Sequence, residues 1–421
     1  MALALAMPAG AEEEAETSAE ERLGAVERAV EILAREQDRL RTAIAVPEDE
    51  ALRSVYGLGP AASKVYWKER GLSLGGYGEW RGRFYVADNS NNVPNVLDAL
   101  RAVLYTGYKF TDWLVFNSEL EFEHAGTGGG GSVSLEFLTL DFLFDPRVSA
   151  RAGLLLLPMG LVNEIHEPTF FFGNERPEVE RRIIPSTWRE NGAGLIGKWG
   201  PVHYRGYGVN GLDASGFSVD GFRSGRQKGS RALAEHWAFT GRVDVDVLDG
   251  LLLGGSVYVG NSGQNQLDDD TGLPIPDALT TIWELHAVFQ RWGATVKGLY
   301  AQSHLRDADA LSFALDLDQD MGVARKMNGG YAEFAYEVLH RFFPDGNMTL
   351  EPFYRYERLN TQKEAASGFT RNRNFDRRFH VVGLQLKPHP QVVIKLDYRN
   401  IDSRGELPIP DEVQIGFGYV F

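Results

Sequence analysis

The sequence predicts an all-β fold: a 16-stranded antiparallel transmembrane β-barrel with a short N-terminal α-helical coiled-coil arm. From Gly71 onward, apolar residues recur at every second position, which is the period of a strand with one apolar face. Tight turns and long polar connections alternate between these stretches. No stretch approaches the ~18 consecutive apolar residues of a membrane helix, so this chain could cross a membrane only as a closed barrel, which pairs its backbone polar groups internally.

Composition narrows the classes of function. The chain has 421 residues and a net charge of −15, which argues against a nucleic-acid partner and against a basic membrane-surface module. It contains no cysteine, which excludes disulfide bonds. Nothing in the sequence indicates a bound cofactor, and we expect none.

The first 70 residues differ in character from the rest. Residues 1–11 resemble a signal-peptide remnant, an apolar run that ends in small residues. Residues 12–45 are predicted to form a coiled coil, and residues 46–70 follow as a linker with no firm period. We expect the coiled coil to be a parallel trimer; the alternative is one amphipathic helix that lies on its own domain. The heptad seam consists of Leu23, Val26, Val30, Leu33, Gln37, Leu40 and Ile44.

Residues 71–421 are predicted to form the barrel. We predict sixteen strands, and an even number is typical of single-chain bacterial barrels. The predicted strands are 72–86, 97–108, 113–124, 133–144, 149–158, 192–199, 202–210, 237–247, 251–260, 281–290, 294–303, 330–339, 349–359, 378–387, 392–401 and 413–421.

The connections support this prediction. One set is tight and made of turn residues, as at 200–201 and 249–250, whereas the other is long and polar, as at 261–278 and 306–327. Short and long connections alternate along the whole domain, as in a barrel with turns at one end and loops at the other. A β-sandwich has no reason to keep this alternation, and a propeller would show a repeat of about 40–50 residues.

Most strands separate an apolar face from a charged face. In strand 392–401, Ile394 and Leu396 lie on one side, and Lys395 and Asp397 lie on the other. A charge at the lipid midplane costs about 2–4 kcal/mol, so the charged faces of a membrane barrel must line a hydrated lumen; the alternative is a soluble sandwich. The predicted pore wall contains Glu79, Arg81, Arg83, Glu119, Glu121, Glu123, Arg205, Arg242, Asp244, Lys297, Arg355, Lys395 and Arg399.

Two further features of the wall follow from the pattern. Residues 135–141 do not keep one parity, which suggests a bulge or a misplaced boundary. Over all predicted wall positions, twelve acidic residues face eight basic ones, a small excess that favours cations.

The third long loop, residues 161–189, is the longest connection. Its aromatic run at 170–172 is too apolar for a solvated loop tip, so we expect the loop to fold into the lumen and form a constriction. The alternative is a loop that caps the outer rim or contacts another subunit. The charged residues that would lie at the constriction are Glu164, His166, Glu167, Glu175, Arg176, Glu178, Glu180, Arg181, Arg182 and Arg189.

No metal site is expected from the sequence. His166 lies between Glu164 and Glu167, but the spacing is not specific to any metal site. The acidic stretches 268–270 and 316–320 carry carboxylates that Ca²⁺ prefers, yet the second lacks the glutamate that closes a calcium loop. We therefore expect both stretches to be solvated loops.

Segments 158–164, 175–180 and 184–188, with the terminal residues 416–421, resemble the trimeric sixteen-stranded outer-membrane porins. The barrel domain is most similar to the phosphate-selective porin O/P family and its uncharacterised relatives. The resemblance implies a homotrimer in the bacterial outer membrane, in contact with lipid and lipopolysaccharide, with the N-terminal arm in the periplasm. It also implies that the outer-membrane assembly machinery recognises the C-terminal strand through Phe421. Anion-binding members of the family use ladders of Arg and Lys, which Glu and Asp interrupt here.

The resemblance and the charged lumen together predict a porin: a passive diffusion channel for ions and small hydrophilic solutes. One alternative is an envelope-tethering protein that binds the cell wall through its N-terminal helix. Another is an outer-membrane enzyme, which would need a nucleophile and a base in contact. Ser303 and His304 are consecutive strand residues that point to opposite faces, so we do not expect an enzyme.

Overall fold

The structure, a computed structural model, describes residues 23–24, 26–35, 53–90, 92–340, 342–343 and 347–421. The chain divides into two compact units, Met1–Glu48 and Asp49–Phe421. In the first unit, residues 23–24 and 26–35 are helical, and the seam residues Leu23, Val30 and Leu33 are exposed. The predicted signal-peptide remnant and the rest of the predicted coiled coil lie outside the described residues. None of the described helices is both long enough and apolar enough to cross a lipid bilayer.

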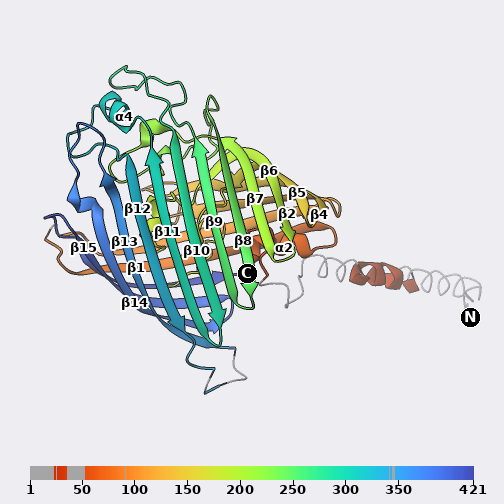
Figure 1. Cartoon of the computed structure of the whole chain (residues 1–421). Coiled ribbons are helices and arrows are strands. Elements are labelled where there is room, and N and C mark those ends of the chain that lie inside the picture. Colours follow the sequence, from red (N-terminus) through yellow and green to blue (C-terminus); the bar gives the residue numbers. More distant parts are fainter. Residues whose placement is uncertain (1–22, 25, 36–52, 91, 341, 344–346) are drawn as a thin grey trace, which may run out of the picture. The chain divides into compact units, whose positions relative to one another are not determined.

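The second unit is a closed antiparallel barrel of sixteen described strands, in which each strand pairs with its neighbours along the chain and β1 pairs with β16 (Figure 1). The predicted sixteen-stranded antiparallel barrel is confirmed, and most strand ends lie within a few residues of the prediction. The strands are β1 (Gly71–Ala87), β2 (Val96–Lys109), β3 (Leu114–Glu123), β4 (Ser132–Asp145), β5 (Val148–Leu156), β6 (Arg189–Trp199), β7 (Val202–Asn210), β8 (Trp237–Leu248), β9 (Leu251–Gly260), β10 (Thr280–Arg291), β11 (Ala294–Leu305), β12 (Lys326–Tyr336), β13 (Thr349–Glu364), β14 (Asp376–His389), β15 (Val392–Ser403) and β16 (Asp411–Val420).

The closing strand forms the seam of the barrel. Tyr419 lies opposite Gly78 on β1, and the backbone of Phe421 exchanges hydrogen bonds of 2.9 and 3.0 Å with Gly76. The alternation predicted for this strand is observed, since Ile415 is exposed on the outer surface whereas Gln414 is buried inside. Closure leaves no unpaired sheet edge, which is the condition for a sheet to exist in lipid.

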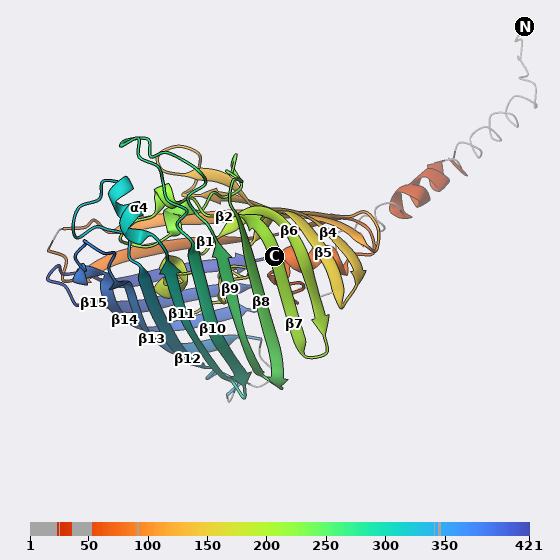
Figure 2. The same cartoon turned by 45° about the horizontal axis from the view of Figure 1, so that its top comes forward.

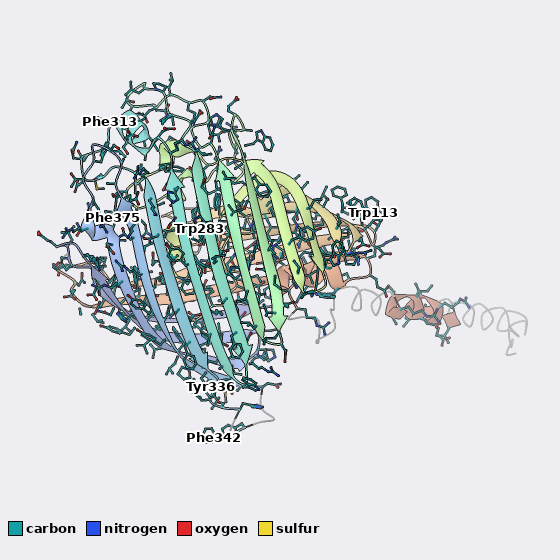
Figure 3. All side chains as sticks on the ribbon, in the orientation of Figure 1. Trp113, Trp283, Phe313, Tyr336, Phe342 and Phe375 are labelled. Atoms are coloured by element: carbon teal, nitrogen blue, oxygen red, sulfur yellow. The ribbon has the colours of Figure 1, made fainter. Side chains whose placement is uncertain are left out.

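The two ends of the barrel differ in their connections. Short turns lie at one end, at 110–113, 146–147, 200–201, 249–250, 292–293 and 390–391, whereas the loops at the other end are mostly long. Figure 2 brings the long-loop end forward, with helix α4 (Ala308–Ala314) among these loops. Figure 3 shows Trp113 and Phe342 at the turn end and Phe313 and Phe375 at the loop end.

One connection at the turn end is longer than predicted. β12 begins at Lys326 and ends at Tyr336, whereas the predicted strand was 330–339. The carboxylate of Glu337 accepts hydrogen bonds from the backbone N–H groups of Leu339 and His340, at 2.7 and 2.8 Å, which ends the strand early. The tight turn predicted at 344–346 lies outside the described residues.

The described part of the predicted linker contains a helix. α2 (Pro60–Trp67) packs inside the barrel against β1, β2 and β3. It begins with a proline, which is favourable at the first position of a helix because the backbone N–H of that position has no acceptor within the helix. The absence of a side chain at Gly107 lets the helix approach the wall, because a Cβ there would lie 2.7 Å from Val65. The helix is short and its apolar residues show only a weak helical period, so the sequence pattern does not predict it.

Candidate functional site

The third long loop, residues 157–188, lies inside the barrel between wall strands on opposite sides. Asn163 closes its base, because its side-chain nitrogen donates to the carbonyl oxygens of Leu157 and Trp188, at 2.7 and 3.0 Å. Its side-chain oxygen accepts from the Trp188 N–H at 2.6 Å. The two ends of the loop are thereby held together where they leave β5 and enter β6.

Three basic wall residues bind the backbone of the aromatic run. Lys395 Nζ donates to the carbonyl oxygens of Phe171 and Gly173, at 2.8 and 2.9 Å. Arg355 donates to the carbonyl of Phe172 at 3.2 Å and to that of Glu175 at 2.9 Å. Lys297 Nζ donates to the Phe170 carbonyl at 3.0 Å. Strands β11, β13 and β15 therefore hold the loop by charge-assisted hydrogen bonds.

The next loop segment contacts strands on both sides of the β1–β16 seam. Glu175 pairs with Arg81 and Arg83 of β1, and Glu178, in helix α3 (Glu178–Arg182), lies 3.4 Å from Arg399 of β15. Burial alone would raise the pKa of Glu175, but Arg81, Arg399 and Arg83 hold it at about 2. Glu175 is therefore ionised at neutral pH.

The loop also contacts further strands of the wall. Glu164 lies 3.3 Å from Arg205 of β7, and Arg242 of β8 donates to the Gly160 carbonyl. Glu180 accepts from Tyr331 Oη of β12 at 2.6 Å. Together with the contacts to β1, β13 and β15, these bonds fix the loop around most of the wall.

Glycines on the closing strand let the loop approach it closely. A Cβ on Gly418 would lie 2.5 Å from Pro168, and one on Gly416 would lie 2.1 Å from the Asn174 side-chain oxygen. The small inner face of β16 is therefore a surface on which the third loop packs.

The loop also contacts helix α2. Glu167 Oε1 accepts a hydrogen bond of 3.2 Å from the Ala61 N–H at the helix N-terminus. Burial raises the pKa of Glu167 to about 8. The third loop thus joins α2 to the rest of the interior.

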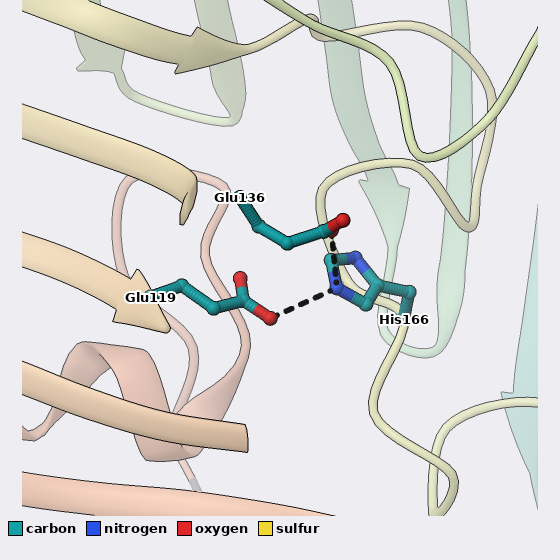
Figure 4. Close-up of side chains that lie close together, drawn as sticks. All are labelled: Glu119, Glu136 and His166. Carbon is teal, nitrogen blue, oxygen red and sulfur yellow. Dashed lines mark hydrogen bonds and ion pairs between the residues drawn. The ribbon is translucent and has the colours of Figure 1, made fainter. Parts of the chain in front are cut away.

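His166 contacts the wall rather than its sequence neighbours Glu164 and Glu167. Its Nε2 lies 3.2 Å from Glu119 of β3 and 3.4 Å from Glu136 of β4 (Figure 4). The bulge suggested for 135–141 is confirmed, because the register shifts between Glu119 and Leu120 and leaves Glu136 as the extra residue of β4.

Two cavities border the loop. One of about 670 Å³ lies at the turn end and is lined by the aromatic run with Lys297, Arg355, Lys387, Glu333 and Glu351 among others. The other, of about 230 Å³, lies toward the long-loop end and is lined by six arginines and two glutamates. The eight are Arg81, Arg83, Arg101, Arg176, Arg181, Arg223, Glu79 and Glu175.

The predicted wall residues lie on the strands as follows: Glu79, Arg81 and Arg83 on β1, Glu119, Glu121 and Glu123 on β3, Arg205 on β7, Arg242 and Asp244 on β8, Lys297 on β11, Arg355 on β13, and Lys395 and Arg399 on β15. Of the predicted loop residues, Arg189 is instead the first residue of β6, where it binds Glu136 at 2.7 Å. Sequence reasoning missed Glu136, because of the bulge, and also Asn163 and Arg223, which carry no motif. The irregular parity of β4 was the one available signal for Glu136.

No family model matches the chain. Among solved structures, it is similar to OmpF of Salmonella typhi in complex with daunomycin (12% identity, 84% of this chain and 98% of that chain, TM-score 0.55). It is also similar to in-vitro folded OmpT in trimer form, an outer membrane protein of Vibrio cholerae (12% identity, 84% of this chain and 100% of that chain, TM-score 0.52). The anion-selective porin of Comamonas acidovorans is similar to the same degree (12% identity, 84% of this chain and 100% of that chain, TM-score 0.52). At this identity the similarity shows the fold alone, which is that of the porins.

In sequence, an uncharacterized protein of Aquifex aeolicus is 36% identical over 377 residues, which make up 87% of this chain and 83% of that protein. An alignment of this length includes most of the barrel, so the two chains share the domain that holds the third loop. The chain therefore belongs to the same family as this Aquifex aeolicus protein, with a barrel of the porin fold.

Proposed function

We propose that the protein is an outer-membrane channel through which small hydrophilic solutes diffuse passively. The observation that carries this proposal is the interior: charged wall residues surround a loop that crosses the lumen, with a cavity on each side. A charged lumen is hydrated, and groups close together at its narrowest part set selectivity. The third loop is the constriction in this proposal.

The outer surface supports a place in a membrane. Exposed aromatic side chains gather at the turn end, and Figure 3 shows Trp113 and Phe342 there. The other exposed aromatic side chains at this end are Phe110, Phe144, Trp199, Trp292, Phe343 and Phe421. This arrangement is typical of the aromatic girdle at a lipid–water interface. By analogy with outer-membrane barrels, the turn end and the N-terminal arm lie in the periplasm.

We propose a homotrimer whose N-terminal coiled coil joins the three chains. The helical residues 23–24 and 26–35 expose the apolar seam, as a coiled-coil partner requires. Removal of residues 12–44 separates the alternatives. Loss of trimers with retained channels supports an assembly role, whereas loss of attachment to the cell wall supports an envelope-tethering protein. An enzyme remains an unfavoured alternative.

The solute class follows from the arginines at the smaller cavity. No ion pair is formed by Arg176 or Arg223 within the described residues, and Arg176 Nη2 and Arg223 Nη1 are buried without an acceptor. Burial, and then repulsion from Arg226 and other arginines, lowers the pKa of Arg223 to about 8. An anion would relieve this repulsion, so anionic solutes are favoured over the cations that the charge count along the wall suggests.

Conductance across a planar bilayer tests the function. The full chain should give stepwise currents, and the reversal potential in a salt gradient should show a preference for anions. Arg176→Gln and Arg223→Gln should reduce that preference, whereas Arg231→Gln, at an exposed position of the same long loop as Arg223, should not. A folded trimer without currents would contradict the channel, and a cation preference would contradict the solute class alone.

A further inference from the structure

We propose that Glu119, Glu136 and His166 bind a divalent transition-metal ion such as Zn²⁺, which joins the third loop to the barrel wall. One ligand atom from each side chain lies within 4.8 Å of the other two, and all three side chains are buried (Figure 4). The two carboxylates come from neighbouring strands, β3 and β4, and the imidazole comes from the loop. The site is structural and does not depend on which solute the channel carries.

The hydrogen bond at one ring nitrogen of His166 determines the state of the other. Nδ1 lies 3.0 Å from the carbonyl oxygen of Asn163, and a carbonyl only accepts, so Nδ1 carries the proton. In the neutral ring, Nε2 then presents its lone pair to the oxygens of Glu119 and Glu136. Ionised carboxylates are acceptors as well, so three lone pairs converge. A proton, on the ring or on a carboxyl group, or a metal ion must lie between them.

The distances fit a metal ion. In a tetrahedral site with bonds of about 2.0–2.1 Å, neighbouring ligand atoms lie about 3.3–3.4 Å apart. His166 Nε2 lies 3.2 Å from Glu119 Oε1 and 3.4 Å from Glu136 Oε2. A bond from Nδ1–H to a backbone carbonyl is also the usual outer contact of a metal-bound histidine. One nitrogen with two oxygens favours a borderline metal over Ca²⁺ or Mg²⁺.

The surroundings of Glu136 leave one of its oxygens free to bind a cation. Glu136 is 1% exposed; its Oε1 binds Arg189, whereas its Oε2, which points at His166, has no hydrogen-bond donor among the described residues. Glu121 lies 3.4 Å from Arg101, which also binds Glu79. Arg101 is thus occupied by other carboxylates, and Arg189 is the guanidinium that forms an ion pair with Glu136 within the described residues. A metal ion would give the unpaired Glu136 Oε2 a partner.

The bulge in β4 supports the assignment. An uninterrupted strand alternates its side chains, so Glu136 and Phe137 could not both point inward. The extra residue allows both to be buried, at 1% exposed each, and brings Glu136 opposite His166. Bulges are frequent beside functional sites because they redirect one side chain in this way.

Metal content and Co²⁺ absorption test the site. The full chain, without a polyhistidine tag, should be folded in detergent with Zn²⁺ or Co²⁺ and then desalted. We expect about one metal ion to be retained per chain, and the Co²⁺ form to show the intense visible bands of tetrahedral coordination. Chelation should lower the melting temperature.

Matched variants separate the site from adventitious binding. His166→Gln, Glu119→Gln and Glu136→Gln should each lose the bound ion and the visible bands. His203→Gln removes a partly exposed histidine that contacts one carboxylate, Asp246 at 3.0 Å, and this variant should keep both the ion and the bands. The proposal is overturned if the unsubstituted chain retains no ion, or if its melting temperature is the same with added Zn²⁺ and with chelator.

Discussion

Arg355→Met tests whether the wall holds the third loop in place. The Arg355 side chain is 1% exposed and gives two hydrogen bonds to loop carbonyls, those of Phe172 and Glu175, besides one to Glu333. Methionine fills a similar volume but donates nothing. Each hydrogen bond from a charged donor contributes about 1.5–3 kcal/mol, and water replaces part of it in the released loop. We therefore expect the substitution to make docking of the loop on the wall less favourable by about 3 kcal/mol.

A loss of about 3 kcal/mol raises the ratio of released to docked loop by roughly 150-fold. Two measurements report on that ratio: the fluctuation of single-channel current, and the rate of trypsin cleavage at Arg181 and Arg182, which lie in α3 of the docked loop. Both should increase, while the barrel itself stays folded by gel mobility.

Arg358→Met is the matched control on the same strand. The Arg358 side chain is 46% exposed and makes one ion pair, at 3.5 Å from Asp376. Exposed pairs contribute about 0–1 kcal/mol, so this change should leave both measurements unaltered. Equal cleavage rates and equal current noise in the two folded variants would refute the view that Arg355 anchors the loop.

Three further predictions concern the loop and the seam. The pKa of Glu167 is about 8 in the folded chain and about 4.3 when unfolded, so its contribution to stability should fall as pH rises between these values. In chemical denaturation, Glu167→Gln should reduce this pH dependence, while its side-chain oxygen still accepts from the Ala61 N–H. Gly418→Val should displace Pro168, because its Cβ would lie 2.5 Å from that ring, and should change conductance without unfolding the barrel. Deletion of Phe421 should reduce the yield of assembled trimer more than the conductance of the trimers that form; normal trimer levels would contradict the assembly role.

Local patterns were sufficient to predict the barrel. The period of two in strands such as 392–401 places Lys395 inside and Ile394 outside whatever the neighbouring strand is, because a charge and an alkyl chain differ by several kcal/mol in lipid. The alternation of turns and loops then fixes the order of the strands. Both signals are contained in short stretches of sequence, so no long-range contact had to be known.

The interior depends on contacts that short stretches do not contain. The eight residues of α2 are helical because the wall at Gly107 leaves space for Val65, and Glu136 points inward because β4 contains one residue more than β3 at that place. Each feature depends on residues that are distant in sequence, and the charges of the third loop are likewise matched to strands as distant as β15. A single sequence shows the charges but not their partners.

For the proposed channel, this pairing predicts that selectivity does not follow the count of wall charges. Lys395 and Arg355 donate to loop carbonyls, and Glu175 forms ion pairs with arginines of β1. Because these groups already have partners inside the protein, they attract a solute only weakly. The groups that can bind a solute are those that the fold leaves unpaired, and in the described part of the chain Arg176 and Arg223 meet that condition beside a cavity. Selectivity should therefore follow these two arginines rather than the acidic excess along the wall.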